Sequence, residues 1–140
     1  MAKRIDNTAC HCLRMRRSAQ NVVDFYDATL APAGVTARQY SLLNQVALND
    51  GCSVSRLAEL TELDRSTLAR SLRPLYARGF LADVREDGAR NKRLTLTAEG
   101  KRVHKEAASL WAEAQRHYEE HLGPERVRAL ESALELLQTL

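Results

Sequence analysis

Arginine and hydroxyl side chains gather on one short stretch in the middle of the chain. Asp64 is placed to cap a helix there, and the leucines at positions 68, 72 and 75 would form the buried face of that helix. Arginine suits the O6/N7 edge of guanine in the major groove, and hydroxyls contact bases or phosphates. The pattern predicts a DNA recognition helix whose outer face carries Arg65, Ser66, Thr67, Arg70 and Arg73.

A second group of cations lies in a polar turn between two strand-like runs. Phe80, Leu81 and Val84 form the first run, and residues 94–96 alternate as the second. A basic loop of this kind can enter a minor groove, where narrow A/T-rich stretches concentrate negative potential. The sequence therefore predicts a basic wing tip with Arg90, Lys92 and Arg93.

The elements that must position these side chains begin at residues that cap helices well. Thr36 with Gln39 three residues later makes a capping-box pattern, and Ser53, Asp64 and Thr97 precede three further helical patterns. Residues 61–63 form the turn between the two short helices. The sequence thus predicts a helix-turn-helix, then the wing, then a long helix to about His121.

The two ends of the chain carry wide apolar stripes. A helix is predicted from about Thr8 to Leu30, and a last helix from about Glu125 has Val127, Leu130, Leu134 and Leu137 at heptad-like spacing. One small helix does not need so wide a stripe inside a single chain. We therefore expect both ends to build a dimer interface, with an ordinary monomer core as the alternative.

Composition bounds the class of protein. The chain of 140 residues fits one domain. Its N-terminus is charged where a signal peptide is apolar, and no run approaches the ~20 apolar residues of a membrane span, so we expect a cytoplasmic protein without membrane contact. Residues 51–102 hold 11 Lys/Arg against 7 Asp/Glu, whereas the remainder holds 10 against 11. This basic centre fits either a DNA footprint or a solvated charged surface.

The order of these elements resembles the MarR family of bacterial winged-helix regulators. The resemblance rests on SVSRLAELTELDRSTLARSLRPLYARGFL, the wing and LTLTAEGKRV, although Gly88 stands where many members carry an acid. It implies a mainly α fold with a small β-wing, in which a winged helix-turn-helix is flanked by N- and C-terminal dimerisation helices. The single domain would span 1–140, with a DNA-binding region at about 35–100 and dimerisation helices at about 1–34 and 101–140.

The resemblance also implies a function. MarR-like proteins bind pseudo-palindromic double-stranded DNA as homodimers, and a small aromatic ligand, an oxidant or, in a few members, a metal ion changes the spacing of the recognition helices. We therefore expect a sequence-specific transcriptional repressor released by an aromatic ligand or by cysteine oxidation. The alternative is a winged helix that contacts proteins, which would not need a basic wing.

One cysteine is a candidate sensor. In the peroxide-sensing branch of the family, a reactive cysteine of the first helix is held by a tyrosine fourteen residues later, and Cys12 and Tyr26 occupy these positions. A second tyrosine of that branch falls at Ala37, three residues before Tyr40. Arginines near Cys12 would favour its thiolate. A buried structural cysteine is the alternative.

Other chemistry finds little support. Phosphate loops, nucleophile elbows and H-E-x-x-H motifs are absent from the sequence, so we expect neither an enzyme nor a cofactor. Three cysteines, an odd number, argue for reduced thiols. His117 and His121 at i, i+4 lack obvious companion ligands, and no metal site is predicted.

Overall fold

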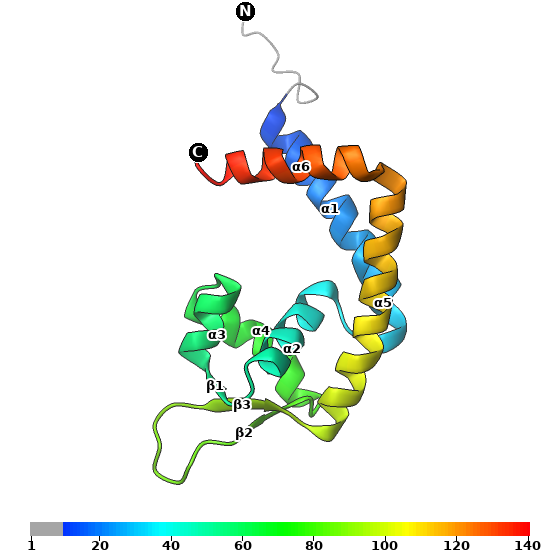
Figure 1. Ribbon diagram of the computed structural model, residues 1–140. Helices are drawn as coiled ribbons and strands as arrows, with labels where there is room; N and C mark the ends of the chain where they lie inside the picture. Colours follow the sequence, from blue (N-terminus) through cyan, green and yellow to red (C-terminus); the bar gives the residue numbers. More distant parts are fainter. Residues whose placement is uncertain (1–9) are drawn as a thin grey trace, which may run out of the picture.

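The computed structural model describes residues 10–140, so the predicted helix start at Thr8 lies outside the described residues. Helices dominate, and a small antiparallel sheet with the strand order β1-β3-β2 accompanies them (Figure 1). The predicted mainly α fold with a β-wing is confirmed. Its elements are α1 (His11–Leu30), the 3₁₀ turn η1 (Ala31–Ala33), α2 (Ala37–Leu48), β1 (Cys52–Ser53), α3 (Val54–Thr61), α4 (Arg65–Ala77), β2 (Leu81–Asp83), β3 (Arg93–Leu96), α5 (Ala98–Leu122) and α6 (Pro124–Leu137).

All four predicted helix caps are formed. The Thr36 hydroxyl accepts a hydrogen bond from the Gln39 amide, and the Gln39 side chain accepts one from the Thr36 amide, which completes the capping box of α2. Ser53, Asp64 and Thr97 each accept a bond from a backbone N–H in the first turn of their helix. Each cap satisfies a donor that the helix itself leaves free, and so fixes where the helix begins.

The strands differ from the sequence prediction in two respects. β2 covers Leu81–Asp83, because the N–H of Phe80 closes α4 by bonding to Leu75 and its carbonyl accepts from Thr97. Val84 lies beyond the strand and is exposed. The sequence analysis also missed β1, whose Cys52 pairs with Leu94 of β3. A two-residue strand leaves no periodic pattern to detect.

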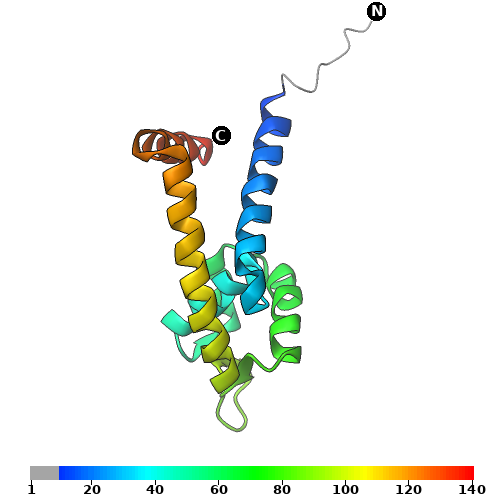
Figure 2. The same ribbon diagram turned by 90° about the vertical axis from the view of Figure 1, so that its right-hand side faces the viewer.

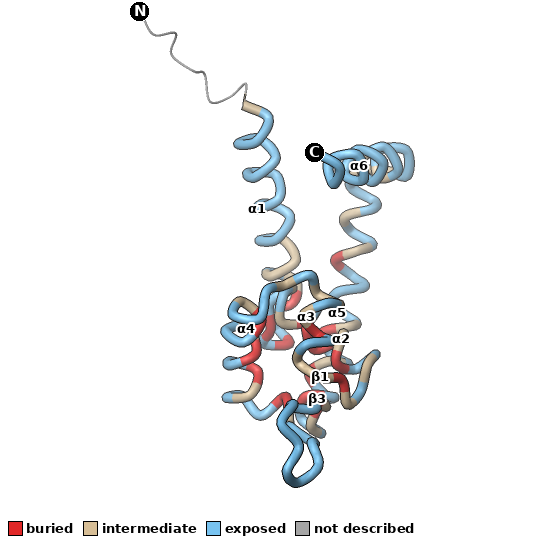
Figure 3. The backbone as a smooth tube through the Cα atoms, turned by 90° about the vertical axis from the view of Figure 1, so that its left-hand side faces the viewer, coloured by how far each residue is buried: buried red, intermediate tan, exposed pale blue. Residues whose placement is uncertain are grey.

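Most of the buried residues lie in one core formed by the winged helix and the elements next to it. Leucines of α3 and α4 meet α2, the sheet and the first half of α5, and the fully buried side chains are Leu30, Leu42, Leu43, Val46, Leu57, Leu68, Leu75, Leu94 and Val103. The N-terminal half of α1 projects beside α5, away from this core (Figure 2). Both that half of α1 and α6 are exposed along most of their length (Figure 3).

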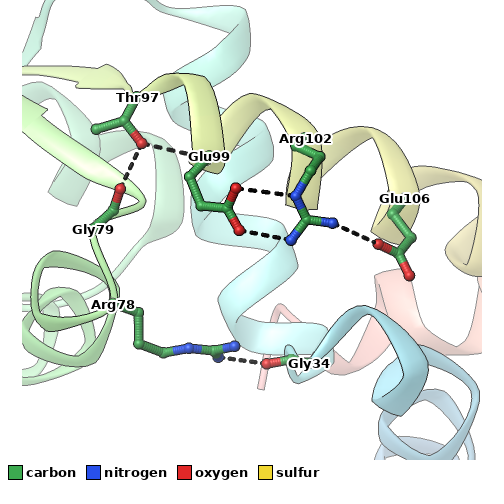
Figure 4. Close-up of polar contacts among 8 residues, drawn as sticks. Gly34, Arg78, Gly79, Thr97, Glu99, Arg102 and Glu106 are labelled. Atoms are coloured by element: carbon green, nitrogen blue, oxygen red, sulfur yellow. Dashed lines mark hydrogen bonds and ion pairs between the residues drawn. The ribbon is translucent and has the colours of Figure 1, made fainter.

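Close backbone contacts join the wing to the long helix. The Thr97 hydroxyl accepts from the Gly100 amide and donates to the Gly79 carbonyl (Figure 4). Gly100 packs directly against the backbone of Phe80. The Arg78 guanidinium donates to the Gly34 carbonyl and covers the Phe80 ring, 4.6 Å from its centroid. These contacts fix the end of α4 against η1 and the start of α5.

Candidate nucleic-acid interface

The start of α4 is organised around the carboxylate of Asp64. Its Oδ1 accepts from the Ser66 hydroxyl at 2.7 Å and the Thr67 amide at 2.8 Å, and its Oδ2 accepts from the Thr67 hydroxyl at 2.7 Å. Hydrogen bonds from the Ser66 and Thr67 side chains, followed by the backbone N–H of Thr67, hold the pKa of Asp64 well below its usual range. The carboxylate is therefore ionised at neutral pH, and it orients both hydroxyls.

The outward face of α4 carries the predicted arginines. Leu68, Leu72 and Leu75 are buried on the opposite face, which leaves Arg70 and Arg73 exposed. The Nη2 atom of Arg70 lies 3.5 Å from the Thr67 hydroxyl oxygen, a long donor contact that links it to the Asp64 cluster. Arg73 follows Arg70 by three residues, so both project from one face of the helix.

The tertiary fold joins α4 to the wing in one shallow cleft of about 210 Å³. Arg65 lies in it and donates to the Ser55 hydroxyl at 3.0 Å, which connects the starts of α3 and α4. Two predicted wing residues, Arg90 and Lys92, line the same cleft, and its full lining is Ser53, Val54, Ser55, Arg65, Arg90, Asn91 and Lys92. Residues separated by some 25 positions in sequence thus share one basic surface.

The base of the wing is held by an acid that sequence analysis did not single out. Asp83 Oδ1 accepts from the backbone N–H groups of Arg85 and Arg93, each at 3.1 Å, and its Oδ2 pairs with the Arg85 guanidinium at 3.1 Å. Desolvation acts to raise the pKa of Asp83, but these hydrogen bonds and the Arg85 charge outweigh it, so the pKa is lowered. The signal in the sequence that could have predicted this contact is the acid, Asp83, at the end of the first wing strand.

The cations of the wing are held to different degrees. The Lys92 ammonium lies 5.3 Å from the centroid of the Tyr76 ring on α4, within cation–π range. Arg93 donates to the Gly51 carbonyl at 3.3 Å. The side chain of Arg90 is exposed, and within residues 10–140 it has neither a hydrogen bond nor an ion pair. Arg90 is thus the wing cation most available to a ligand.

The predicted sensor residues lie apart. Cys12 is exposed on α1. Tyr26 is fourteen residues further along the same helix, or about 21 Å at the helical rise, and donates to the side chain of Gln115 on α5. Within one chain the two side chains therefore lie about 21 Å apart, because a continuous helix separates them, and a role of Tyr26 in holding Cys12 stays a prediction. Cys52 is buried in β1, and burial raises the pKa of its thiol.

Tyr40 belongs to an aromatic cluster that sequence analysis missed. Its ring stacks on that of His104 with centroids 5.8 Å apart, and Trp111 lies 6.1 Å away. His104 Nε2 is 3.0 Å from the Asn44 side-chain oxygen. Burial raises the pKa of Tyr40 and lowers that of His104. The cluster joins α2 of the winged helix to α5.

Titration of His104 predicts a pH dependence of stability. Because its pKa in the folded state lies below the ordinary value of 6.5, the unfolded chain takes up a proton first as pH falls. The stability that comes from keeping His104 neutral in the folded state is complete above the ordinary pKa, and it is lost as pH falls through the lower pKa of the folded state. Urea unfolding at about pH 7.5 and about pH 5.0 should show a larger loss of stability in wild type than in His104→Gln. An equal loss in both proteins would exclude this histidine as the cause.

A second groove, of about 350 Å³, lies between the exposed halves of α1 and α5. The Phe25 and His117 rings meet there at 5.2 Å, and His121 lies on the next turn of α5. Across residues 10–140, no group of three His, Cys, Asp or Glu residues is arranged to hold a metal ion. In the same range, no helix is long and apolar enough to span a membrane.

Comparisons with known proteins identify this architecture. Residues 33–93 match the model of the MarR family. A curated relative, an uncharacterised HTH-type transcriptional regulator YybA of Bacillus subtilis, is 32% identical over 83 residues, which cover 59% of this chain and about half (52%) of that protein.

Solved structures are similar over nearly the whole chain. The Mycobacterium tuberculosis transcriptional regulator MosR in complex with DNA is 31% identical, with a TM-score of 0.76 and coverage of 93% of this chain and 96% of that one. The PcaV regulator of Streptomyces coelicolor with its natural ligand is 26% identical, covers 99% and 98% of the two chains, and has a TM-score of 0.83. The chain therefore belongs to the MarR family, whose members are transcriptional regulators and not enzymes.

Proposed function

We propose that this regulator binds pseudo-palindromic double-stranded DNA as a homodimer and represses transcription until a signal releases it. The observation that carries the proposal is the basic cleft shared by α3, α4 and the wing. In this proposal α4 enters the major groove with Arg65, Ser66, Thr67, Arg70 and Arg73, and Arg90, Lys92 and Arg93 reach the adjacent minor groove. The MosR complex with DNA supports this reading.

The unburied ends of the chain support the homodimer. No residue of α6 is buried within the described chain, and Leu134, Leu136 and Leu137 are 43%, 70% and 42% exposed. Leu13, Met15, Val22 and Val23 of α1 are exposed as well. The N-terminal half of α1 is basic, with arginines at 14, 16 and 17, whereas the C-terminal half of α6 carries Glu131 and Glu135 and no cation. Packing of these surfaces between two copies would bury the apolar side chains and bring opposite charges together.

The proposed domain organisation follows. One domain spans 1–140, in which about 35–100 bind DNA and about 1–34 and 101–140 set the distance between the two recognition helices. Titration against the chain's own promoter region at several salt concentrations tests the function, with sedimentation to determine whether the mass is twice 15.7 kDa. Sequence-specific, salt-dependent binding by a dimer is expected. Absence of DNA affinity at low salt would favour a protein-binding winged helix instead.

Removal of the wing cations should weaken DNA binding without changing sequence choice. In Arg90→Ala and Lys92→Ala, affinity should fall similarly for specific and non-specific DNA, and the salt slope should drop by about 1 for each phosphate that is no longer neutralised. The effect should be larger for Arg90, whose side chain is not held by Tyr76. Fluorescence anisotropy across a salt series measures both quantities. A change in base preference in either variant would mean that the wing reads sequence directly.

Two signals are proposed, each with its own residue. Cys12 is exposed among the arginines of α1, where a dissolved oxidant can reach its sulfur, so it is the candidate for oxidation. Tyr40 is buried against His104 and Trp111 between α2 and α5, and this aromatic cluster is the candidate contact for a small aromatic ligand. The PcaV structure in complex with its natural ligand supports a ligand as the signal. Tyr26, in this proposal, acts through its contact with α5.

Organic peroxide should release wild-type protein from DNA and leave Cys12→Ser bound. The expected result is a fall in affinity of about tenfold or more in wild type, reversed by a thiol reductant. Cys52→Ser, which alters a buried thiol, is the matched control and should respond like wild type. Release that persists in Cys12→Ser would remove Cys12 from the sensor, and no release of wild type would leave the aromatic cluster as the candidate.

A further inference from the structure

The hydroxyl groups at the start of α4 have a fixed hydrogen-bond polarity. A hydroxyl has one proton to donate and lone pairs that accept. The Ser66 proton goes to Asp64 Oδ1 and the Thr67 proton goes to Asp64 Oδ2, each at 2.7 Å. The exposed Asp64 carboxylate thus uses both donors, so the two hydroxyls can offer only lone pairs to a ligand.

This polarity matters in the major groove because bases differ in what they present there. Adenine N6 and cytosine N4 are donors, whereas guanine N7 and O6 and thymine O4 are acceptors. Phosphate oxygens are acceptors as well. A hydroxyl whose proton is held by Asp64 can therefore pair with an exocyclic amino group but not with a phosphate or with guanine.

We propose that Asp64 is a specificity-positioning residue, which makes Ser66 and Thr67 acceptors that select the amino group of adenine or cytosine. The inference rests on the proposed DNA-binding function. A switch of either hydroxyl to a phosphate would break a hydrogen bond to an ionised acceptor, which is about twice as strong as a neutral one. Arg70 contributes the complementary preference, because its guanidinium donates only and suits guanine.

The geometry allows the hydrogen-bond direction of the Thr67 hydroxyl to be changed while that of the Ser66 hydroxyl is kept. The Thr67 amide and the Ser66 hydroxyl both bond to Oδ1, whereas the Thr67 hydroxyl alone bonds to Oδ2. In Asp64→Asn, an amide oxygen at the Oδ1 position keeps the helix cap and the Ser66 bond. The amide nitrogen then faces Thr67 Oγ1 as a donor, so the Thr67 proton is free to point at DNA.

The test uses DNA that wild-type protein selects from a random pool. In that DNA, adenine is replaced by purine and cytosine by 2-pyrimidinone, one position at a time, so that only the amino group is lost. Affinities are measured for wild type, Ser66→Ala, Thr67→Val and Asp64→Asn, and 7-deazaguanine substitution serves as the acceptor control. Loss of Watson–Crick pairing affects all four proteins, so each position is read as a ratio between proteins.

Wild type should lose about 3- to 10-fold, the size of one hydrogen bond, at one amino group for each hydroxyl. The affinity of Thr67→Val should not change when the amino group contacted by Thr67 is removed. Likewise, the affinity of Ser66→Ala should not change when the amino group contacted by Ser66 is removed. Asp64→Asn should lose the Thr67 sensitivity, gain a preference for an acceptor base there, and keep the Ser66 sensitivity. A merely structural role of Asp64 would lower affinity at all positions without this exchange.

Two results would overturn the inference. The first is that the base positions contacted by Ser66 and Thr67 respond to 7-deazaguanine, which lacks the N7 acceptor, and not to loss of an amino group. That result would mean that the hydroxyls donate to DNA. Unchanged base preference in Asp64→Asn, with Thr67→Val also equal to wild type, would mean that they do not read bases. If wild type selects no sequence at all, the proposed function fails first, which is a separate and distinguishable outcome.

Discussion

Replacement of Gly100 by alanine is expected to destabilise the fold by about 3 kcal/mol, the upper part of the range for overpacking. A Cβ at this position would overlap the Phe80 carbonyl oxygen and lie 2.9 Å from its carbon, and both neighbours are backbone atoms that cannot rotate away. Helix propensity alone predicts the opposite sign, since alanine is favoured over glycine by about 1 kcal/mol in a helix interior. The steric overlap should dominate.

Relief of the overlap would require movement of α5 away from Phe80. That movement breaks the bond from the Thr97 amide to the Phe80 carbonyl, 3.0 Å long, and separates the wing base from α5. Urea unfolding followed by circular dichroism measures the effect. Gly79→Ala is the matched control, because its φ of +74° is left-handed but nothing lies within 4 Å of the added atom. It should cost only about 1–2 kcal/mol. Equal stability of Gly100→Ala and wild type would contradict the packing described.

Replacement of Arg70 by alanine is expected to lower affinity for the specific operator about 10- to 100-fold, the worth of one base-specific arginine pair. Arg70 is exposed on the outward face of α4 and contacts the Thr67 hydroxyl, so its guanidinium is directed at the start of the helix. Non-specific affinity should fall much less, because a base contact adds little to phosphate neutralisation.

Competition assays with operator and unrelated DNA separate the two affinities. Arg116→Ala is the control, since it removes the same charge from the C-terminal half of α5, which lies away from α4 and the wing (Figure 1). Its specificity ratio should equal that of wild type. If Arg70→Ala lowers both affinities by the same factor, Arg70 is a phosphate contact and the sequence is read elsewhere.

Local patterns were sufficient to predict most of the secondary structure. The capping residues Thr36, Ser53, Asp64 and Thr97 all begin helices, because a cap depends on a side chain and a backbone amide only three residues apart. The turn between α3 and α4 was predicted at residues 61–63, one residue early, because Thr61 is still the last residue of α3. The boundary between α5 and α6 was predicted between about His121 and Glu125, where α5 ends at Leu122 and α6 begins at Pro124. The position of the arginines on the outer face of α4 followed from helical periodicity.

Long-range contacts could not be predicted in this way. β1 exists because its residues pair with β3, and the hydrogen bond from the Arg93 amide to Asp83 also depends on the packing of β3. The stacking of Tyr40 on His104 joins residues 64 positions apart. Cys12 and Tyr26 lie about 21 Å apart along α1, so whether the two side chains meet depends on packing that their spacing in the sequence does not determine.

Residue type and short spacing were enough to establish the helices, their caps, the basic wing and the resemblance to MarR regulators. The packing of the elements was needed to bring Arg65, Arg90 and Lys92 into one cleft and to leave Gly100 no room for a side chain. The Asp64 carboxylate was predictable as a cap, but its hold on the protons of two neighbouring hydroxyls emerged only from the folded geometry. A pattern fixes the direction of a side chain on its own element, whereas its partners depend on how the elements pack.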